Sequence, residues 1–129
     1  MALRIALDTN RYTDLCRGDP EVAEILYTAQ EIFLPFVVIA ELRAGFALGR
    51  HASNNERTLQ RFLAKPGVQP IFAGDATTNL YADVYSQLRK QGTPIPTNDI
   101  WIAALTVEHN LTLFSRDSHF DNLPQINVI

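Results

Sequence analysis

The chain has 129 residues, of which 47% are hydrophobic and 19% are charged. This size is typical of a single domain with one hydrophobic core, and the composition excludes a disordered chain. Eleven basic and 14 acidic residues give a net charge of −3, so there is no basic excess to indicate nucleic-acid binding. Divalent cations held by several of the acids would, however, remove most of this negative field. We predict one domain over residues 1–129.

The compartment is predicted from the cysteine content and from the length of the apolar runs. Cys16 is the single cysteine, so the chain has no internal disulfide, and we expect this residue to lie in the core. The longest apolar run covers residues 33–40, contains Pro35 and stops at Glu41, which is too short for a membrane span. These features predict a soluble protein of the cytoplasm.

Four short apolar runs have the length and composition of buried strands. They cover residues 3–7, 31–34, 68–72 and 111–115, and residues 127–129 are a possible short fifth strand. Segments with apolar residues at helical spacing lie between them, at residues 19–29, 35–49, 53–65, 75–91 and 97–110. Strands that alternate with helices form right-handed βαβ units. We therefore predict an α/β fold, with a mostly parallel sheet covered by helices on both faces.

Four carboxylates that are far apart in the sequence are predicted to lie at one edge of this sheet. Asp8 ends the first strand, Asp117 follows the fourth, and Asp99 begins the helix that leads into the fourth. Glu41 lies about two turns into the helix after the second strand. Open parallel sheets bind ligands at the carboxyl ends of their strands. The topology therefore predicts one shared acidic site.

Three of these acids also have an ordinary structural explanation. Asp8 can cap a following helix, Asp99 suits a first helical turn because of the helix dipole, and Asp117 can be a turn residue. For Asp8 taken alone, the cap is the favoured interpretation. The four acids taken together favour a metal site, and all-oxygen ligation suits one or two Mg²⁺ or Mn²⁺ ions.

Glu41 is the acid that is hardest to explain structurally. On a helical wheel it falls among Val37, Ala44 and Leu48, and opposite Arg43. An unpaired carboxylate on an apolar stripe costs several kcal/mol or becomes protonated. This position therefore predicts a partner for Glu41, and a metal ion is a natural one.

Other polar residues near the acids have weaker signals. His119 lacks metal-ligand spacing and is predicted to be a solvated loop histidine, with entry into the site as the alternative. Arg116 is a candidate contact for a substrate phosphate, and its alternative is an ordinary turn arginine. Three basic residues form a row at helical spacing: Arg57, Arg61 and Lys65. We predict that this row is a solvated helix face, and the alternative is a surface that binds phosphates or an acidic partner.

Four blocks of the sequence resemble PIN domains, most closely VapC-type toxins of bacterial toxin–antitoxin pairs. They are residues 7–10 (LDTN), 38–45 (VIAELRAG), 96–104 (PTNDIWIAA) and 113–120 (LFSRDSHF). Residues 123–128 are similar to the last strand of the family. The resemblance covers essentially the whole chain, in order and at suitable spacing.

The resemblance implies a three-layer α/β/α sandwich with Mg²⁺- or Mn²⁺-dependent endoribonuclease activity. It also implies a homodimer and a small antitoxin that blocks the site. Asn10 falls on the small polar position that supports the site, and Ser115 and Asp121 are further candidate supporting residues. The acidic positions of the family fall on Asp8, Glu41, Asp99 and Asp117, with Asp121 as an alternative to Asp117.

Our hypothesis for the reaction is in-line hydrolysis of an RNA phosphodiester by a metal-activated water. Asp8, Asp99 and Asp117 would carry the metal, and Glu41 would hold a second ion or orient the water. One alternative is a catalytically inactive PIN-like module that binds RNA or protein. The other is a Mg²⁺-dependent phosphatase or phosphotransfer domain, although such folds use a late lysine and no lysine follows Lys90.

Overall fold

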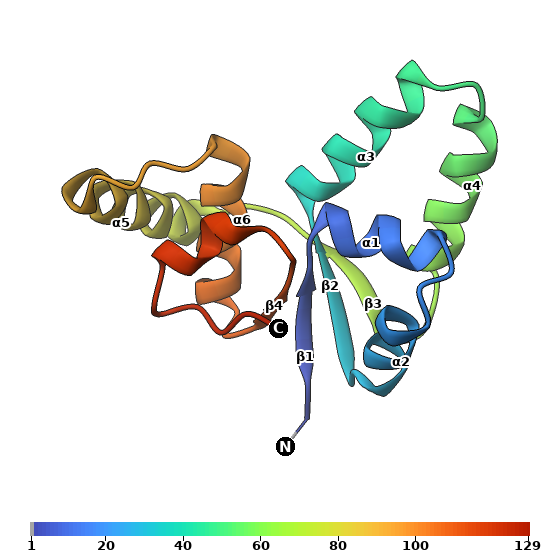
Figure 1. Cartoon of the computed structure of the whole chain (residues 1–129), viewed down its shortest axis with the longest axis horizontal. Coiled ribbons are helices and arrows are strands. Elements are labelled where there is room, and N and C mark those ends of the chain that lie inside the picture. The colour runs from blue at the N-terminus through green and yellow to red at the C-terminus, as the bar shows by residue number, and fades with distance from the viewer. Residues whose placement is uncertain (1) are drawn as a thin grey trace.

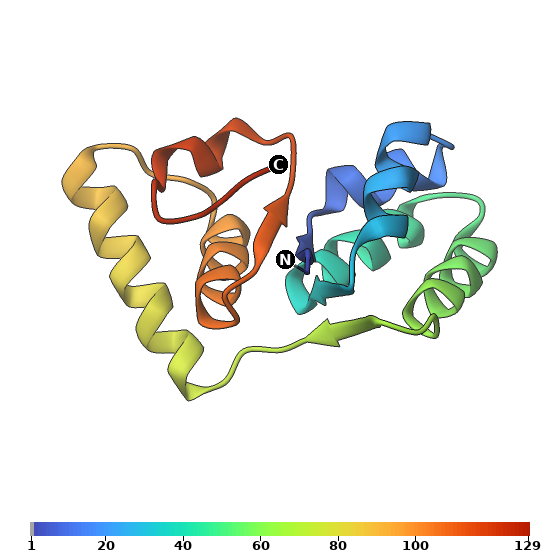
Figure 2. The same cartoon turned by 90° about the horizontal axis from the view of Figure 1, so that it is seen from below.

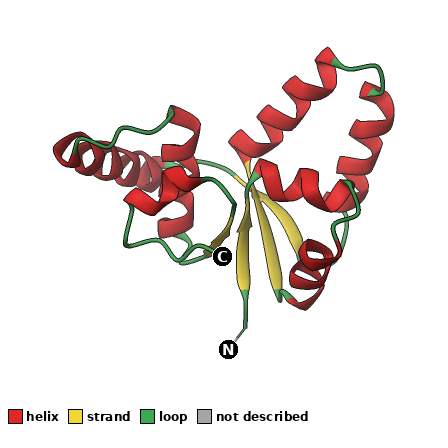
Figure 3. Ribbon diagram, viewed as in Figure 1, coloured by secondary structure: helices red, strands yellow, loops and turns green. Residues whose placement is uncertain are grey.

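The computed structural model describes residues 2–129 and contains one parallel sheet. Its strands are β1 (Arg4–Leu7), β2 (Glu31–Pro35), β3 (Val68–Ile71) and β4 (Thr112–Phe114). They lie in the order β3-β2-β1-β4, and every neighbouring pair is parallel (Figure 3). The predicted parallel sheet is confirmed with four strands. The C-terminal segment adds only an isolated bridge, from Val128 to Leu113, in place of a fifth strand.

Helices cover the sheet on both sides. They are α1 (Thr9–Cys16), α2 (Pro20–Thr28), α3 (Phe36–Leu48), α4 (Ala52–Leu63), α5 (Asp75–Gln91), α6 (Thr97–Glu108) and the 3₁₀ helix η1 (Ser118–Asn122). Helices α1 to α4 lie on one side of β1, and α5, α6 and η1 lie on the other (Figure 1). The predicted α/β/α architecture is confirmed. Within residues 2–129, no helix has the length and apolar character required to cross a membrane.

The strand order reverses beside β1. From β1 the chain moves outward to β2 and then to β3, each time over the same side of the sheet. The segment after β3 then carries the chain across to α5 and α6, and it returns as β4 on the opposite edge of β1 (Figure 2). The point between β1 and β4 is therefore the topological switch point, where open α/β sheets bind their ligands.

The central strand explains why the sequence adopts this layered fold. Ile5 and Leu7 point to one face of the sheet and Ala6 to the other, and all three are completely buried. A strand that is apolar on both faces requires cover on both faces, which the two helical layers supply. On one side this cover comes from α6, whose buried residues include Ile102, Ala103, Ala104 and Leu105.

The prediction that Cys16 lies in the core is wrong, because this residue is exposed at the end of α1. Helix α1 is short and directs Tyr12 inward instead. The Tyr12 ring packs edge-on against Phe62 of α4, with 5.3 Å between the ring centroids. Tyr12, together with the partly buried Leu15, thus supplies the apolar contact of this helix, and the cysteine is left at the surface.

Candidate active site at the switch point

Asp8 is buried at the junction of β1 and α1 and uses its two carboxylate oxygens differently. Its Oδ1 accepts a hydrogen bond of 2.8 Å from the backbone N–H of Thr9, which caps α1. Its Oδ2 accepts a bond of 2.6 Å from the hydroxyl of Ser115, the residue after β4. Asp8 is therefore both the helix cap and a member of the cluster at the switch point, and neither interpretation excludes the other.

Ser115 organises the polar groups around Asp8. Its hydroxyl oxygen accepts the backbone N–H of Asp117 at 3.0 Å and the side-chain amide of Asn10 at 3.4 Å. The same Asn10 amide lies 3.4 Å from Oδ2 of Asp8, and its carbonyl oxygen accepts the backbone N–H of Arg116 at 3.3 Å. Asn10 and Ser115 thus join the end of β1 to the segment that follows β4.

Asp99 and Asp117 meet through His119. Asp99 lies in the first turn of α6 and is buried, and its Oδ2 is 2.8 Å from Nδ1 of His119. The same nitrogen is 3.0 Å from Oδ1 of Asp117. The prediction that His119 is a solvated loop residue is wrong, because the turn into η1 directs its ring to both acids. These three residues offer ligand atoms that all lie within 4.8 Å of one another, so they could hold a metal ion.

Glu41 lies beside Asp8, but its predicted burial on an apolar stripe is wrong. The part of α3 that carries Glu41, Ala44 and Leu48 is exposed, and Leu48 is 92% exposed. Glu41 therefore avoids the burial cost of an apolar stripe. Its Oε1 accepts a hydrogen bond of 2.9 Å from the hydroxyl of Thr9, which holds it at the open rim of the cluster. No motif in the sequence indicates this role of Thr9.

The two remaining candidates lie at the margin of the cluster. The Arg116 guanidinium forms a two-pronged ion pair with Asp14 of α1, at 3.0 and 3.1 Å, and about half of its side chain is exposed. This pairing lowers the pKa of Asp14. Asp121 is exposed on η1 and lies outside the group formed by Asp99, Asp117 and His119. The geometry therefore places Asp117, rather than Asp121, among the clustered acids.

Burial and mutual repulsion both act on the carboxylates of the cluster, and His119 opposes this effect at Asp99. Burial raises the pKa of Asp99 to about 6, and the nearby charges of Asp117 and Asp8 act in the same direction. Burial also raises the pKa of Asp8, assisted by Glu41 and Asp117, although the Ser115 hydrogen bond opposes the change. The hydrogen bond with Asp99 raises the pKa of His119. A divalent cation would relieve this repulsion, so the residues present fit such an ion.

Comparison with known proteins identifies the family of the chain. The family model of the PIN domain matches residues 5–126, which is nearly the whole chain. The chain belongs to the PIN domain family. A VapC ribonuclease of Sinorhizobium fredii, Y4jK, is 30% identical over 88% of this chain and 87% of its own length. The toxin FitB of Neisseria gonorrhoeae is 27% identical, with 88% of both chains covered.

A solved structure shows the same fold. VapBC2 of Rickettsia felis, crystallised with a DNA fragment from its promoter, superimposes on this PIN domain with a TM-score of 0.86. The match covers 98% of both chains at 24% identity. At this level of identity the likeness establishes the fold alone.

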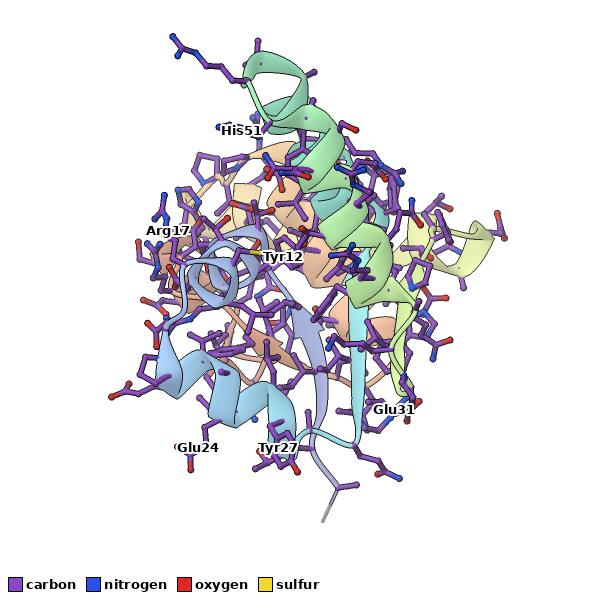
Figure 4. All side chains as sticks on the ribbon, turned by 90° about the vertical axis from the view of Figure 1, so that its right-hand side faces the viewer. Tyr12, Arg17, Glu24, Tyr27, Glu31 and His51 are labelled. Carbon is purple, nitrogen blue, oxygen red and sulfur yellow. The ribbon has the colours of Figure 1, made fainter. Side chains whose placement is uncertain are left out.

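The basic row along α4 and the residues that follow it is solvated, as predicted. Arg57, Arg61 and Lys65 are all exposed, and Arg57 donates a hydrogen bond of 2.6 Å to Asn54 one turn earlier. Figure 4 views this helix from outside the PIN domain, with side chains projecting from it below His51. The row lies on the outer helical layer, away from the switch point (Figure 1).

The metal-free PIN domain should lose stability as the pH rises from 5 to 8. Asp99 has a folded-state pKa above its unfolded value of 3.8, so its contribution is complete below that value and is lost as the pH rises through about 6. His119 also has a raised pKa, so its contribution is lost above its ordinary value of 6.5. Melting curves in EDTA should therefore show Tm falling over this range. Two results would contradict the assignment of this pH dependence to Asp99. One is a Tm that does not change with pH, and the other is an Asp99→Asn variant whose Tm changes as much as that of the wild type.

Ser115→Ala should weaken metal binding without unfolding the PIN domain. The change removes the donor to Asp8 and the acceptor for the Asp117 backbone N–H. Loss of a group that orients metal ligands typically costs about 10- to 100-fold in metal affinity. Calorimetric titration with Mn²⁺ measures the effect, and Ser118→Ala, at an exposed serine three residues later, is the matched control. Equal affinities for the two variants would exclude the supporting role of Ser115.

Proposed function

We propose that this PIN domain is a metal-dependent endoribonuclease and the toxin of a type II, VapBC-like toxin–antitoxin pair. The observation that carries the proposal is the convergence of Asp8, Glu41, Asp99 and Asp117 at the switch point, on a chain whose relatives include a named ribonuclease and a named toxin. We further propose that the protein acts in the cytoplasm, on RNA.

The catalytic ion would be Mg²⁺ or Mn²⁺, bound as one or two ions. Asp8, Asp99 and Asp117 would hold it, and it would supply an activated water and stabilise the charge on the phosphoryl group. Of the remaining acids, Glu41 has the exposure needed to reach a second ion or the attacking water. Its hydrogen bond with Thr9 fixes its approach to the site.

The neighbouring polar residues would keep these carboxylates in place. Ser115 and the Thr9 backbone N–H each bind one oxygen of Asp8, so this side chain keeps its orientation as substrate arrives. Asn10 binds Ser115 and Asp8 together and would stabilise the same geometry. Arg116 is exposed beside the cluster, where its guanidinium would contact a substrate phosphate while Asp14 holds it.

A small antitoxin and a second copy of the chain are the partners we propose. The relevant observation is that VapBC2 of Rickettsia felis, whose fold this chain shares, was crystallised on promoter DNA. In this chain, exposed apolar side chains such as Leu48 and Phe72 offer surface that a partner would cover.

The test is cleavage of a mixed RNA pool by the purified, partner-free chain. Cleavage should require Mg²⁺ or Mn²⁺, should stop in EDTA and should be lost in Asp99→Asn. Asp121→Asn, which changes an exposed acid four residues after Asp117, should cleave normally. Intact RNA at several salt and metal concentrations would favour an inactive binding module, and labelling by a small phosphodonor would favour a phosphotransfer domain.

A further inference from the structure

His119 occupies a position that the four-acid description of the site leaves unexplained. Its Nδ1 faces two carboxylates, at 2.8 Å from Oδ2 of Asp99 and 3.0 Å from Oδ1 of Asp117. These acids come from different elements, the first turn of α6 and the cap of η1. The imidazole therefore joins two acids of the cluster that come from different segments of the chain.

The backbone fixes this position. The N–H of His119 donates a hydrogen bond of 3.0 Å to Oδ1 of Asp117, so the carboxylate and the ring are held as one unit. The next residue, Phe120, is 1% exposed and anchors η1 in the core. The His119 side chain itself stays 44% exposed, which leaves the site open for an ion to enter from solvent.

The distances fit ligation of a single ion. Two ligands at right angles, each about 2.1 Å from a metal, lie about 3.0 Å apart. The separations of Nδ1 from the two carboxylate oxygens, 2.8 and 3.0 Å, match this value. Ligand atoms of all three residues lie within 4.8 Å of one another, so a metal would need only small shifts of these side chains.

We propose that His119 is a metal ligand through Nδ1, and that Asp99, Asp117 and His119 form a mixed oxygen and nitrogen site that selects Mn²⁺ over Mg²⁺. Imidazole is a ligand of transition metals, whereas Mg²⁺ is held by oxygen ligands and water. A neutral nitrogen among the carboxylates therefore favours the transition metal. The use of this ion in RNA cleavage rests on the proposed function. The binding of the ion does not, because binding is measured without RNA.

The test uses the metal-free full chain with Mn²⁺ and with Mg²⁺ as probes. Electron spin-echo spectroscopy of bound Mn²⁺ should show nuclear coupling to one ¹⁴N, which should disappear in His119→Asn. The amide of this variant can still donate to the carboxylates but is a poor ligand. His51→Gln, at the exposed start of α4, is the matched control and should keep the coupling (Figure 4).

Calorimetry should show the same selectivity. His119→Asn should weaken Mn²⁺ binding by about tenfold or more, and Mg²⁺ binding by much less. Retained Mg²⁺ binding also shows that the variant folds. Absence of ¹⁴N coupling in the wild type, or equal losses for both ions, would overturn the proposal and leave His119 as a hydrogen-bonding residue. Cleavage of RNA without nitrogen coupling would refute this inference alone, whereas nitrogen coupling without cleavage would refute the ribonuclease proposal alone.

Discussion

Asp99→Asn is expected to abolish most RNA cleavage and, at the same time, to stabilise the metal-free protein. The amide keeps the shape of the side chain, and its oxygen can still accept a hydrogen bond from His119. It cannot supply the charge that holds a divalent cation. Loss of several kcal/mol of transition-state stabilisation corresponds to a fall of roughly 10²- to 10³-fold or more in the cleavage rate.

The gain in stability has the opposite cause. Asp99 is a buried carboxylate whose pKa is raised to about 6. Above that pH its negative charge therefore destabilises the folded protein relative to the unfolded chain. Removing the charge should raise the free energy of unfolding in EDTA at pH 8 by on the order of 1–3 kcal/mol. Urea denaturation measures this change, and Asp83→Asn, at an exposed acid of α5, should give no significant change. A less stable Asp99→Asn protein would show that the carboxylate is needed for folding rather than for binding.

Phe120→Ala is expected to have the largest effect on stability. The ring is 1% exposed and belongs to the main hydrophobic core, and truncation of a buried Phe to Ala costs about 3–5 kcal/mol. Since η1 has only five residues, Phe120 is also the anchor that holds Asp117 and His119 against α6. We therefore expect weaker Mn²⁺ binding in addition to the lower stability.

Urea denaturation and Mn²⁺ titration of the same variant separate the two effects. Phe72→Ala is the matched control, because this ring is 66% exposed and its loss should change stability by less than about 0.5 kcal/mol. Phe120→Leu should retain most of the stability, since the cavity it leaves is smaller. Unchanged Mn²⁺ affinity in a folded Phe120→Ala protein would show that η1 does not position its ligands through this contact.

The arrangement of the acids could be predicted because it follows from chain order. Asp8 comes directly after a strand that ends in three buried apolar residues, and Asp117 comes shortly after β4, so a parallel sheet brings both to one edge. Asp99 is brought to the same edge because α6 runs directly into β4. These relations depend on the hydrophobic periodicity and the direction of the strands and helices, and short stretches of the sequence indicate both.

The contacts within the cluster could not be predicted, because they depend on side-chain directions in turns. The ring of His119 reaches Asp99 only because Asp117 caps η1 and turns the chain back. The helical wheel places Glu41 on an apolar stripe, but this part of the stripe is exposed to solvent, so burial does not explain its position. The wrong prediction for Cys16 has a local cause, because its helix has only eight residues and buries a tyrosine instead.

The hydrogen bond between Asp8 and Ser115 joins residues that are 107 positions apart, and β4 is the last strand of the sheet to be synthesised. Asp8 and Glu41 leave the ribosome long before Asp99, Asp117 and His119 do, and β1 meanwhile has an unpaired edge. Contacts between residues this far apart in sequence have a large loop-closure cost, so we expect them to form late in folding. A nascent chain that ends before β4 lacks both Asp117 and the Ser115 hydroxyl that binds Asp8, so it cannot complete the carboxylate cluster.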